Sequence, residues 1–193
     1  FLIKKLKAHP RKIVFTEGTD ARILEAAARL LSATFLMPVL VGNREEILSA
    51  AEEVGFNVKG AEILDPETFE DMDKMVAEMV ALRKGKMTEE QCRAALKQGN
   101  YFGTMLVKMG YADALLGGAT YSTADTVRPA LQLIKTKPGC KIVSSCFILV
   151  RPSATGDPDV FAMADCAINI KPTEDELVEI AVETVQTART FGI

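Results

Sequence analysis

The residues best suited to chemistry lie together at positions 117–129. This segment combines two adjacent glycines, a cluster of hydroxyl side chains, one carboxylate and one arginine, and it follows a short apolar run. Backbone N–H groups at a helix N-terminus carry partial positive charge, so an anion such as phosphate can bind there. Hydroxyls add neutral donors, and Arg128 adds a forked cation that suits phosphate oxygens. The segment is therefore a candidate anion cradle.

The same residues also fit a helix start that binds no ligand. Ser122 and Asp125 have the spacing of a capping box. Arg128 has the spacing to pair with Asp125 on the same face of a helix. The segment alone leaves helix capping and ligand binding open.

The composition indicates an ordinary globular protein and narrows its partners. The chain has 193 residues, of which 48% are hydrophobic and 25% charged, which is enough apolar material for a core. The net charge is -3, with acidic and basic residues mixed, so the chain has no basic face for nucleic acid. No apolar run reaches membrane-spanning length, and residues 1–6 predict a surface helix, not a secretory signal. We expect a cytoplasmic protein with no nucleic-acid or membrane partner.

The cysteines and the single histidine limit the chemistry further. None of the four cysteines forms a CxxC pair or lies near His9 in sequence, so we predict no metal site and reduced thiols. Nucleophilic chemistry with a histidine base would have to use His9, which lies in a lysine-rich segment before Pro10. Any catalysis is therefore expected to depend on hydroxyls, arginines, carboxylates and backbone dipoles.

The elements that position this segment alternate between strands and helices. Strands are predicted at 12–16, 35–41, 61–64 and 112–116. Pro38 places the second strand toward an edge or a bulge of the sheet. Pro66 is expected in the first turn of a helix, and Asn100 is expected to cap another. This alternation predicts a three-layer, Rossmann-like α/β domain with a parallel sheet over residues 1–138.

A break at Lys137-Pro138-Gly139 marks the predicted domain boundary. Residues 141–150 predict a central strand, 160–163 and 167–170 predict two short strands, and a last helix begins with a capping box of Thr173 and Glu176. We interpret residues 139–193 as the truncated start of a second α/β domain. We therefore expect a fragment of a longer protein, although residues 4–11 have the character of a genuine N-terminal start.

Three charged residues near predicted element ends each have two interpretations. Glu17 and Arg22 flank a tight loop at the carboxyl end of the first strand, where α/β folds bind ligands, but they also fit a turn capped by Asp20 or Thr19 with a surface ion pair. Arg83 ends a helix, where a cation offsets the helix dipole, but it is also placed to reach a polyanionic, nucleotide-like ligand.

Three segments of the chain resemble the phosphate acetyl/butyryltransferase family. They are FTEGTDARILEAA (15–27), YSTADTVRPALQ (121–132) and FAMADCAIN (161–169). The run STADTVRP is the most specific of these, and the resemblance extends in order over essentially the whole chain. It implies a two-domain α/β fold, an active site between the domains, commonly a homodimer, and reversible transfer of an acetyl group between coenzyme A and inorganic phosphate.

The resemblance also implies roles for particular residues. Arg128 takes the position of a catalytic, phosphate-binding arginine, Arg83 takes that of a coenzyme-binding arginine, and three hydroxyls take those of the phosphate-binding loop, namely Ser122, Thr123 and Thr126. Coenzyme A, phosphate and acetyl phosphate are implied as substrates, with no permanently bound cofactor and no metal. Tyr121 stands where many members carry histidine. The aspartate proposed as base for the coenzyme thiol belongs to a part of the family pattern that this chain does not contain.

Three alternative functions are also compatible with the sequence. The nearest is a phosphate butyryltransferase, which differs only in the length of the acyl group. A second is a non-catalytic regulatory domain that senses acyl-CoA or acyl phosphates, as in the C-terminal half of some malic enzymes. A third is a related decarboxylating dehydrogenase, although the metal-binding aspartates and the nicotinamide site that such enzymes need are not recognisable in the sequence.

Overall fold

The chain folds into two compact units. The computed structural model describes residues 2–153 and 156–193. Unit 1 comprises Phe1–Lys135 and unit 2 comprises Thr136–Ile193. The division after Lys135 lies close to the domain boundary predicted after residue 138.

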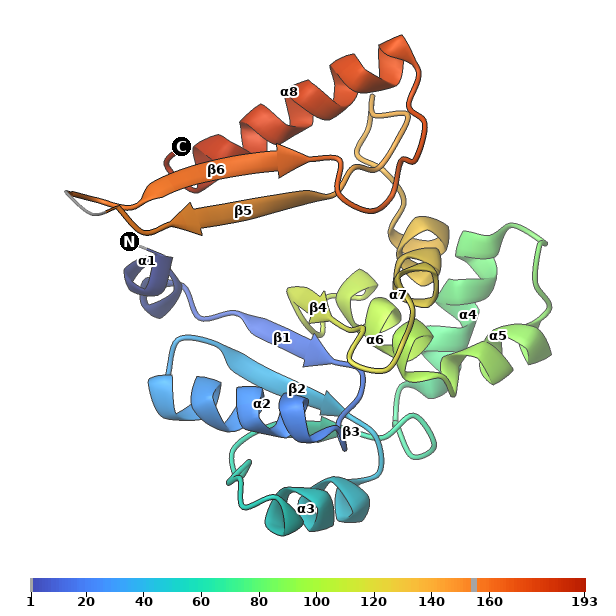
Figure 1. The fold of residues 1–193 in the computed structure, drawn as a ribbon. Helices are drawn as coiled ribbons and strands as arrows, with labels where there is room; N and C mark the ends of the chain where they lie inside the picture. The colour runs from blue at the N-terminus through green and yellow to red at the C-terminus, as the bar shows by residue number, and fades with distance from the viewer. Residues whose placement is uncertain (1, 154–155) are drawn as a thin grey trace. The chain divides into compact units, whose positions relative to one another are not determined.

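Unit 1 is built on a parallel sheet of four strands in the order β3-β2-β1-β4 (Figure 1). Val14 on β1 lies beside Val39 on β2 and, on its other side, beside Leu115 on β4. The direction in which strands are added therefore reverses between β1 and β4, which makes this point the topological switch of the sheet. The strands are β1 (Lys12–Phe15), β2 (Met37–Val41), β3 (Glu62–Leu64) and β4 (Ala114–Leu116).

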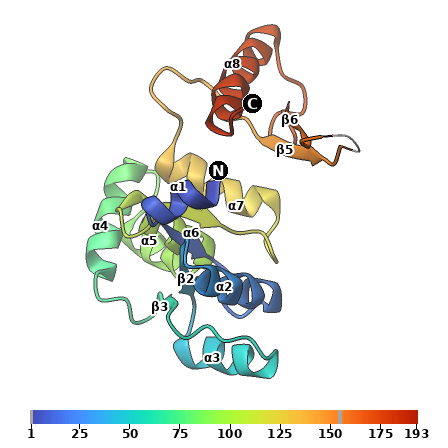
Figure 2. The same cartoon turned by 90° about the vertical axis from the view of Figure 1, so that its left-hand side faces the viewer.

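Helices cover both faces of this sheet. Val14 joins a core with the helices of residues 72–134, whereas the next residue, Phe15, faces the opposite way and joins α2 and α3. Figures 1 and 2 show α2 and α3 on the other side of the sheet from α4, α5 and α6. The helical elements are α1 (Leu2–Ala8), α2 (Ala21–Ala33), α3 (Arg44–Glu53), α4 (Met72–Arg83), α5 (Glu89–Leu96), α6 (Gly99–Lys108), α7 (Thr123–Pro129) and the π-helical turn η1 (Ala130–Ile134).

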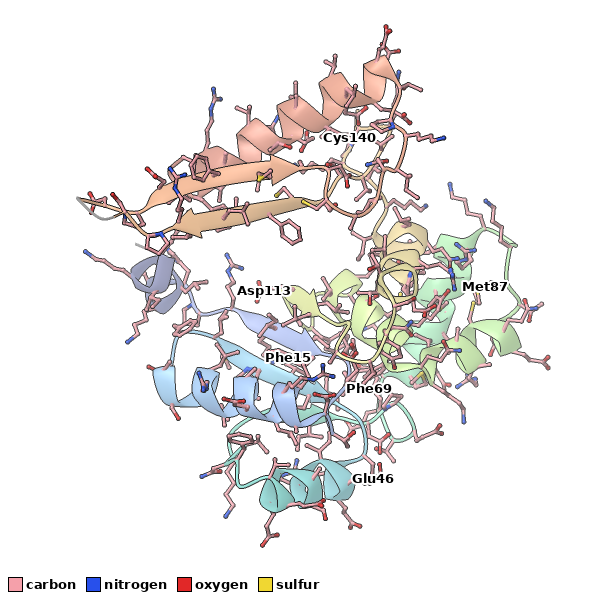
Figure 3. The ribbon with its side chains drawn as sticks, in the orientation of Figure 1. Phe15, Glu46, Phe69, Met87, Asp113 and Cys140 are labelled. Carbon is pink, nitrogen blue, oxygen red and sulfur yellow. The ribbon has the colours of Figure 1, made fainter. Side chains whose placement is uncertain are left out.

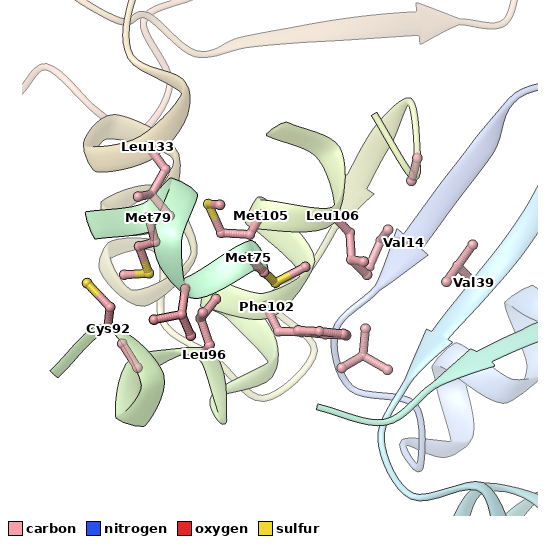
Figure 4. Close-up of a cluster of buried hydrophobic side chains, with 14 residues drawn as sticks. Val14, Val39, Met75, Met79, Cys92, Leu96, Phe102, Met105, Leu106 and Leu133 are labelled. Carbon is pink, nitrogen blue, oxygen red and sulfur yellow. The ribbon is translucent and has the colours of Figure 1, made fainter. Parts of the chain in front are cut away.

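These layers confirm the predicted three-layer α/β architecture of unit 1. Figure 4 shows the larger core, in which Met75, Met79 and Phe102 are fully buried. The methionines of α4 therefore fill the core, and flexible thioether side chains suit such irregular gaps. The predicted surface helix at the N-terminus is α1, and Phe1 lies outside the described residues.

The expectation that Pro38 marks an edge strand or a bulge is wrong. β2 pairs with both β1 and β3, so it lies inside the sheet. Pro38 pairs only with Ile13 of β1, because the pairing with β3 begins at Val39. The missing N–H of Pro38 therefore removes no bond to β3, which is how a proline is tolerated near the start of an interior strand.

Two expected helix starts are also wrong. The helix expected at Pro66 begins instead at Met72, because Asp65 accepts the Glu67 N–H at 2.9 Å and holds the segment in a turn. Asn100 does not cap α6, since the N-cap position is Gln98 and the helix begins at Gly99.

Unit 2 is a two-stranded antiparallel hairpin followed by one long helix. The strands are β5 (Cys146–Arg151) and β6 (Asp159–Ala164), and the helix is α8 (Glu174–Thr190). The predicted capping box at the start of α8 is confirmed, because Thr173 and Glu176 exchange hydrogen bonds. Ile180 is the one apolar side chain of unit 2 that is buried among the described residues. The fold of this unit therefore leaves most of its apolar side chains at the surface.

Two of the strands predicted for unit 2 differ from the structure. Residues 141–145 precede the strand, because the N–H groups of Lys141 and Ile142 donate to the Glu179 carboxylate of α8 at 2.7 and 3.2 Å. Residues 167–170 are not a strand, because the N–H groups of Ala167 and Ile168 donate to Asp165. The long central strand expected at 141–150 is thus half of a hairpin.

Among the described residues, no helix is long and apolar enough to cross a bilayer.

Candidate active site

The candidate site lies where the loops that follow β1 and β4 meet. These two strands are neighbours and parallel, so their carboxyl ends open on the same edge of the sheet. A Cβ atom added to Gly117, directly after β4, would lie 2.7 Å from the Thr16 hydroxyl oxygen, directly after β1. The two loops are therefore in close contact, at the switch point where open α/β sheets bind their ligands.

The start of α7 presents the predicted hydroxyls and arginine together. Ser122 is the N-cap residue: its hydroxyl oxygen accepts the Asp125 N–H at 3.2 Å and the hydroxyl donates to the Asp125 carboxylate at 2.6 Å. The Thr126 hydroxyl donates to the Ser122 carbonyl at 3.2 Å. Thr123, the first helical residue, is exposed. Ser122 therefore caps α7 as expected, but the full capping box is not formed, because the Asp125 carboxylate accepts the Ser122 hydroxyl and not its N–H. The hydroxyls remain grouped on one turn.

Arg128 is held only loosely. Its Nη1 lies 3.5 Å from Asp125 Oδ1, and the side chain is 57% exposed. An exposed ion pair of this kind contributes little to stability, so its rupture costs little. The guanidinium is therefore free to turn away from Asp125.

Arg83 lies apart from this group. It is the last residue of α4, and its Nε is buried without a hydrogen-bond partner among the described residues. Burial raises the pKa of the Cys92 thiol on α5, and the nearby positive charge of Arg83 opposes that rise. Within the described part of the chain, no hydrogen bond or ion pair links Arg83 to α7. The structure thus brings four of the five predicted site residues onto one segment and places Arg83 elsewhere in unit 1.

Glu17 is a residue of the site whose role the sequence left open. Its Oε1 accepts the N–H groups of Thr120, Gly118 and Tyr121 at 2.8, 3.1 and 3.3 Å. The Thr16 hydroxyl donates to Oε2 at 2.9 Å, and Glu17 is 8% exposed. The N–H groups of the glycine loop therefore surround a carboxylate of the chain itself.

Burial and hydrogen bonding act in opposite directions on this carboxylate. Burial alone would raise the pKa of Glu17, but the hydrogen bonds from Thr120, Thr16, Tyr121 and Gly118 outweigh it, so that the pKa is lowered. Burial raises the pKa of the Tyr121 hydroxyl, and the negative charge of Glu17 raises it further. The site therefore contains an ionised Glu17 and a neutral Tyr121 at neutral pH.

Arg22 also binds this loop, through a backbone carbonyl. The hydrogen bond from the Arg22 side chain is the main cause that lowers the pKa of Asp20 to about 2, and Asp20 also caps α2. Arg22 Nη2 in addition donates to the Ala119 carbonyl at 2.7 Å. The expected surface ion pair exists, and it also anchors the loop after β4.

Asn100 fastens the start of α7 to α6. Its Nδ2 donates to the Asp125 carbonyl at 2.8 Å, and the residue is 7% exposed. In a regular helix this carbonyl would accept the N–H of position 129, which is Pro129 and has none. The Asn100 side chain therefore replaces the backbone N–H that Pro129 lacks.

Two hollows adjoin these elements. One of about 490 Å³ follows the ends of β1, β2 and β3, and carboxylates of Glu46, Asp65 and Glu67 line it (Figure 3 labels Glu46). Lys97 in its wall is paired with Glu67 at 2.9 Å, so acidic side chains outnumber basic ones in the lining, which disfavours an anion there. The other, of about 240 Å³, is apolar and includes Thr126 and Val127 in its wall. Over the described residues, no cluster of three or more histidine, cysteine or acidic side chains is arranged to hold a metal ion.

Fold and site together define a Rossmann-like α/β protein with a group of hydroxyls and an arginine at the switch point of its sheet. A family model described as "Phosphate acetyl/butaryl transferase" matches residues 1–193, and the chain belongs to this family. The resemblance of the three segments is thereby confirmed.

Individual relatives agree with this assignment. The chain is 50% identical over 190 residues to a phosphate acetyltransferase of Bacillus subtilis. The matched region covers 98% of this chain and 57% of that protein. The chain is also 46% identical over 192 residues to a phosphate acetyltransferase of Thermoanaerobacterium thermosaccharolyticum, and this match covers 98% of the chain and 58% of that protein. The chain thus spans little more than half the length of these relatives.

Two solved structures have the same fold. A phosphotransacetylase from Streptococcus pyogenes superposes with a TM-score of 0.92 at 47% identity, and an EutD phosphotransacetylase from Staphylococcus aureus with 0.91 at 41%. Each comparison covers 100% of this chain and 57% of the other.

Proposed function

We propose that the protein transfers an acetyl group reversibly between coenzyme A and inorganic phosphate. The observation that carries this proposal is the family match over all of residues 1–193, together with relatives named for this activity at 50% and 46% identity. These relatives are named for acetyl transfer, and nothing in them favours butyryl transfer or a regulatory domain.

The reaction matches the side chains available. In one direction the coenzyme thiolate attacks the carbonyl carbon of acetyl phosphate, a C–S bond forms, and phosphate leaves with the electron pair of the broken C–O bond. In the other direction a phosphate oxygen attacks the thioester and the thiolate leaves. Both directions require a phosphate held in place and stabilisation of the charge that develops on the carbonyl oxygen. Hydroxyls and guanidinium groups supply both.

We assign the phosphate to the start of α7. Ser122, Thr123 and Thr126 provide hydroxyls within one turn, and the loosely paired Arg128 provides the bidentate cation. Arg83 is assigned to the phosphates of coenzyme A, since its buried and unpaired Nε indicates a guanidinium held in position for a partner. In this assignment Arg128 contacts the reacting phosphate and is the catalytic residue.

The wider organisation is part of the same proposal. Coenzyme A acts as a dissociable substrate and no cofactor is bound permanently. The protein works in the cytoplasm as a homodimer, and the domains divide after residue 138.

An assay with Arg128→Ala in the full-length protein tests the assignment. Phosphate-dependent release of coenzyme A from acetyl-CoA is measured beside release from butyryl-CoA. We expect turnover of acetyl-CoA by the unaltered protein and a loss of about 10²–10³-fold in kcat/KM for phosphate in the variant. Arg29→Ala is the matched control, because Arg29 is 79% exposed in an ion pair on α2. An unchanged KM for phosphate with unchanged turnover would remove Arg128 from the site, and faster use of butyryl-CoA would reassign the acyl group.

A further inference from the structure

A group of converging N–H donors in the candidate site is already occupied by a carboxylate of the chain itself. Successive backbone N–H groups that converge on one point form a nest for anions. In the loop after β4 such N–H groups, those of Gly118, Thr120 and Tyr121, converge on Glu17 Oε1. The Thr120 hydroxyl adds a further donor at 3.3 Å. A substrate phosphate cannot use these donors while the carboxylate occupies them.

The position of Glu17 explains why it stays ionised in a buried place. A buried carboxylate is costly unless hydrogen bonds replace those it makes with water. Thr16 and the N–H groups of residues 118, 120 and 121 supply these bonds to Glu17. Arg22 interacts with Glu17 only through its charge, because its guanidinium is committed to Asp20 and to the Ala119 carbonyl. The bonds to Glu17 therefore come from backbone and hydroxyl dipoles, which are held in place by the loop itself.

These contacts fix the loop through two residues. Glu17, in the turn between β1 and α2, binds its N–H groups, and Arg22, in the first turn of α2, binds its Ala119 carbonyl. Ser122 follows directly after the last N–H group of the nest. The direction in which α7 begins, and with it the placement of the hydroxyls and of Arg128, thus depends on this attachment to β1.

We propose that Glu17 is a positioning residue: its carboxylate occupies the nest of residues 118–121, keeps substrate anions out of it, and thereby orients Ser122, Thr126 and Arg128 toward phosphate. The identity of the bound anion rests on the proposed function, whereas the attachment of the loop does not. Glu17 touches no reacting atom in this arrangement.

The first experiment follows the loop amides by ¹H–¹⁵N NMR in the 193-residue chain. In Glu17→Ala we expect the amide of Thr120 to exchange with solvent roughly tenfold faster, and added formate to restore its protection in a saturable way. Glu17→Gln keeps the shape of the side chain, so its amide pattern reports on the lost charge even if the alanine variant unfolds. The control is Glu53→Ala, an exposed glutamate on α3.

A titration of the unaltered chain with inorganic phosphate completes this experiment. We expect shifts at Ser122, Thr123 and Thr126 and not at the nest. Larger shifts at the Gly118 and Thr120 amides would show that phosphate displaces Glu17 and would overturn the proposal. Unchanged amide exchange in both Glu17 variants would overturn it as well.

Kinetics of the full-length protein then separate positioning from mere stability. We expect Glu17→Ala to raise KM for phosphate and to lower kcat/KM about 100-fold, with formate recovering part of the loss. A variant that loosens the loop amides but keeps KM and kcat unchanged would refute the positioning role. If the unaltered protein has no acetyltransferase activity, the proposed function fails, and the amide data still decide whether Glu17 holds the loop.

Discussion

Replacement of Asn100 by alanine is the perturbation for which the structure provides the clearest magnitude. The Asn100 side chain donates to the Asp125 carbonyl and accepts the N–H of Tyr101 at 2.9 Å. Since Pro129 has no N–H to offer, truncation leaves the carbonyl at the start of α7 without this donor. The loosened element is the one that carries the candidate phosphate ligands.

The expected loss of stability follows from two opposing effects. A buried polar group left without its partner costs about 1–3 kcal/mol. Alanine has a better helix propensity than asparagine by up to about 0.7 kcal/mol. The difference, about 0.3–2.3 kcal/mol, corresponds to a change of roughly 2–50-fold in the unfolding equilibrium.

Tyrosine fluorescence in a urea titration measures this loss selectively. The chain has no tryptophan, and its three tyrosines, Tyr101, Tyr111 and Tyr121, all belong to unit 1. The matched control is Gln98→Ala at the same helix end, because Gln98 is exposed and makes no capping hydrogen bond with its side chain. We expect the control to change the free energy of unfolding by less than about 0.5 kcal/mol.

A double-mutant cycle with Pro129→Ala tests the stated cause. Alanine at position 129 restores an N–H for the Asp125 carbonyl, so the cost of Asn100→Ala is expected to fall by about 1 kcal/mol in that background. Equal costs in both backgrounds would refute the explanation. So would an Asn100→Ala midpoint no lower than that of Gln98→Ala.

Two further predictions concern the turn after β1. The lowered pKa of Glu17 stabilises the folded chain above the ordinary glutamate pKa of 4.5, and this contribution is lost as the pH falls through the lower folded value. The stability difference between the unaltered chain and Glu17→Gln is therefore expected to be constant well above pH 4.5 and to shrink as the pH falls below it; a difference that stays constant in urea titrations on both sides of pH 4.5 would contradict it. Gly18→Ala would bring a Cβ within 2.6 Å of the Val41 carbonyl oxygen and is expected to cost about 1–3 kcal/mol, whereas Thr19→Ala, at an exposed neighbour, is expected to cost little. Equal urea midpoints for these two variants would contradict the predicted crowding.

Local patterns in the sequence were sufficient for most elements of unit 1. The apolar run of β1 and the Asp20 cap of α2 each involve residues close together in the chain. The fold class follows from the alternation of such elements. Each of these signals depends on interactions within a few residues, which a single sequence displays directly.

Several of the errors occur where a side-chain carboxylate accepts backbone N–H groups. The apolar residues before β5 have the composition of a strand, but Glu179 of α8 accepts the N–H groups of Lys141 and Ile142. Asp165 does the same for residues 167 and 168, and its own pKa, which burial alone would raise, is strongly lowered by the bonds that it accepts. A propensity scale cannot register such competition, because the acceptor lies elsewhere in the chain or outside the ladder.

The candidate site shows the same limit in a sharper form. The grouping of Ser122, Thr126 and Arg128 was predictable because one helical turn contains it. The role of Glu17 was not, since a carboxylate before a glycine at the end of a strand looks the same whether it faces a substrate or a nest of N–H groups. What decides between them is the strand order, which places β4 beside β1 and brings a loop about 100 residues away onto Glu17. The same strand order explains how a glycine loop with the composition of an anion cradle has its N–H donors satisfied by a carboxylate of the chain itself.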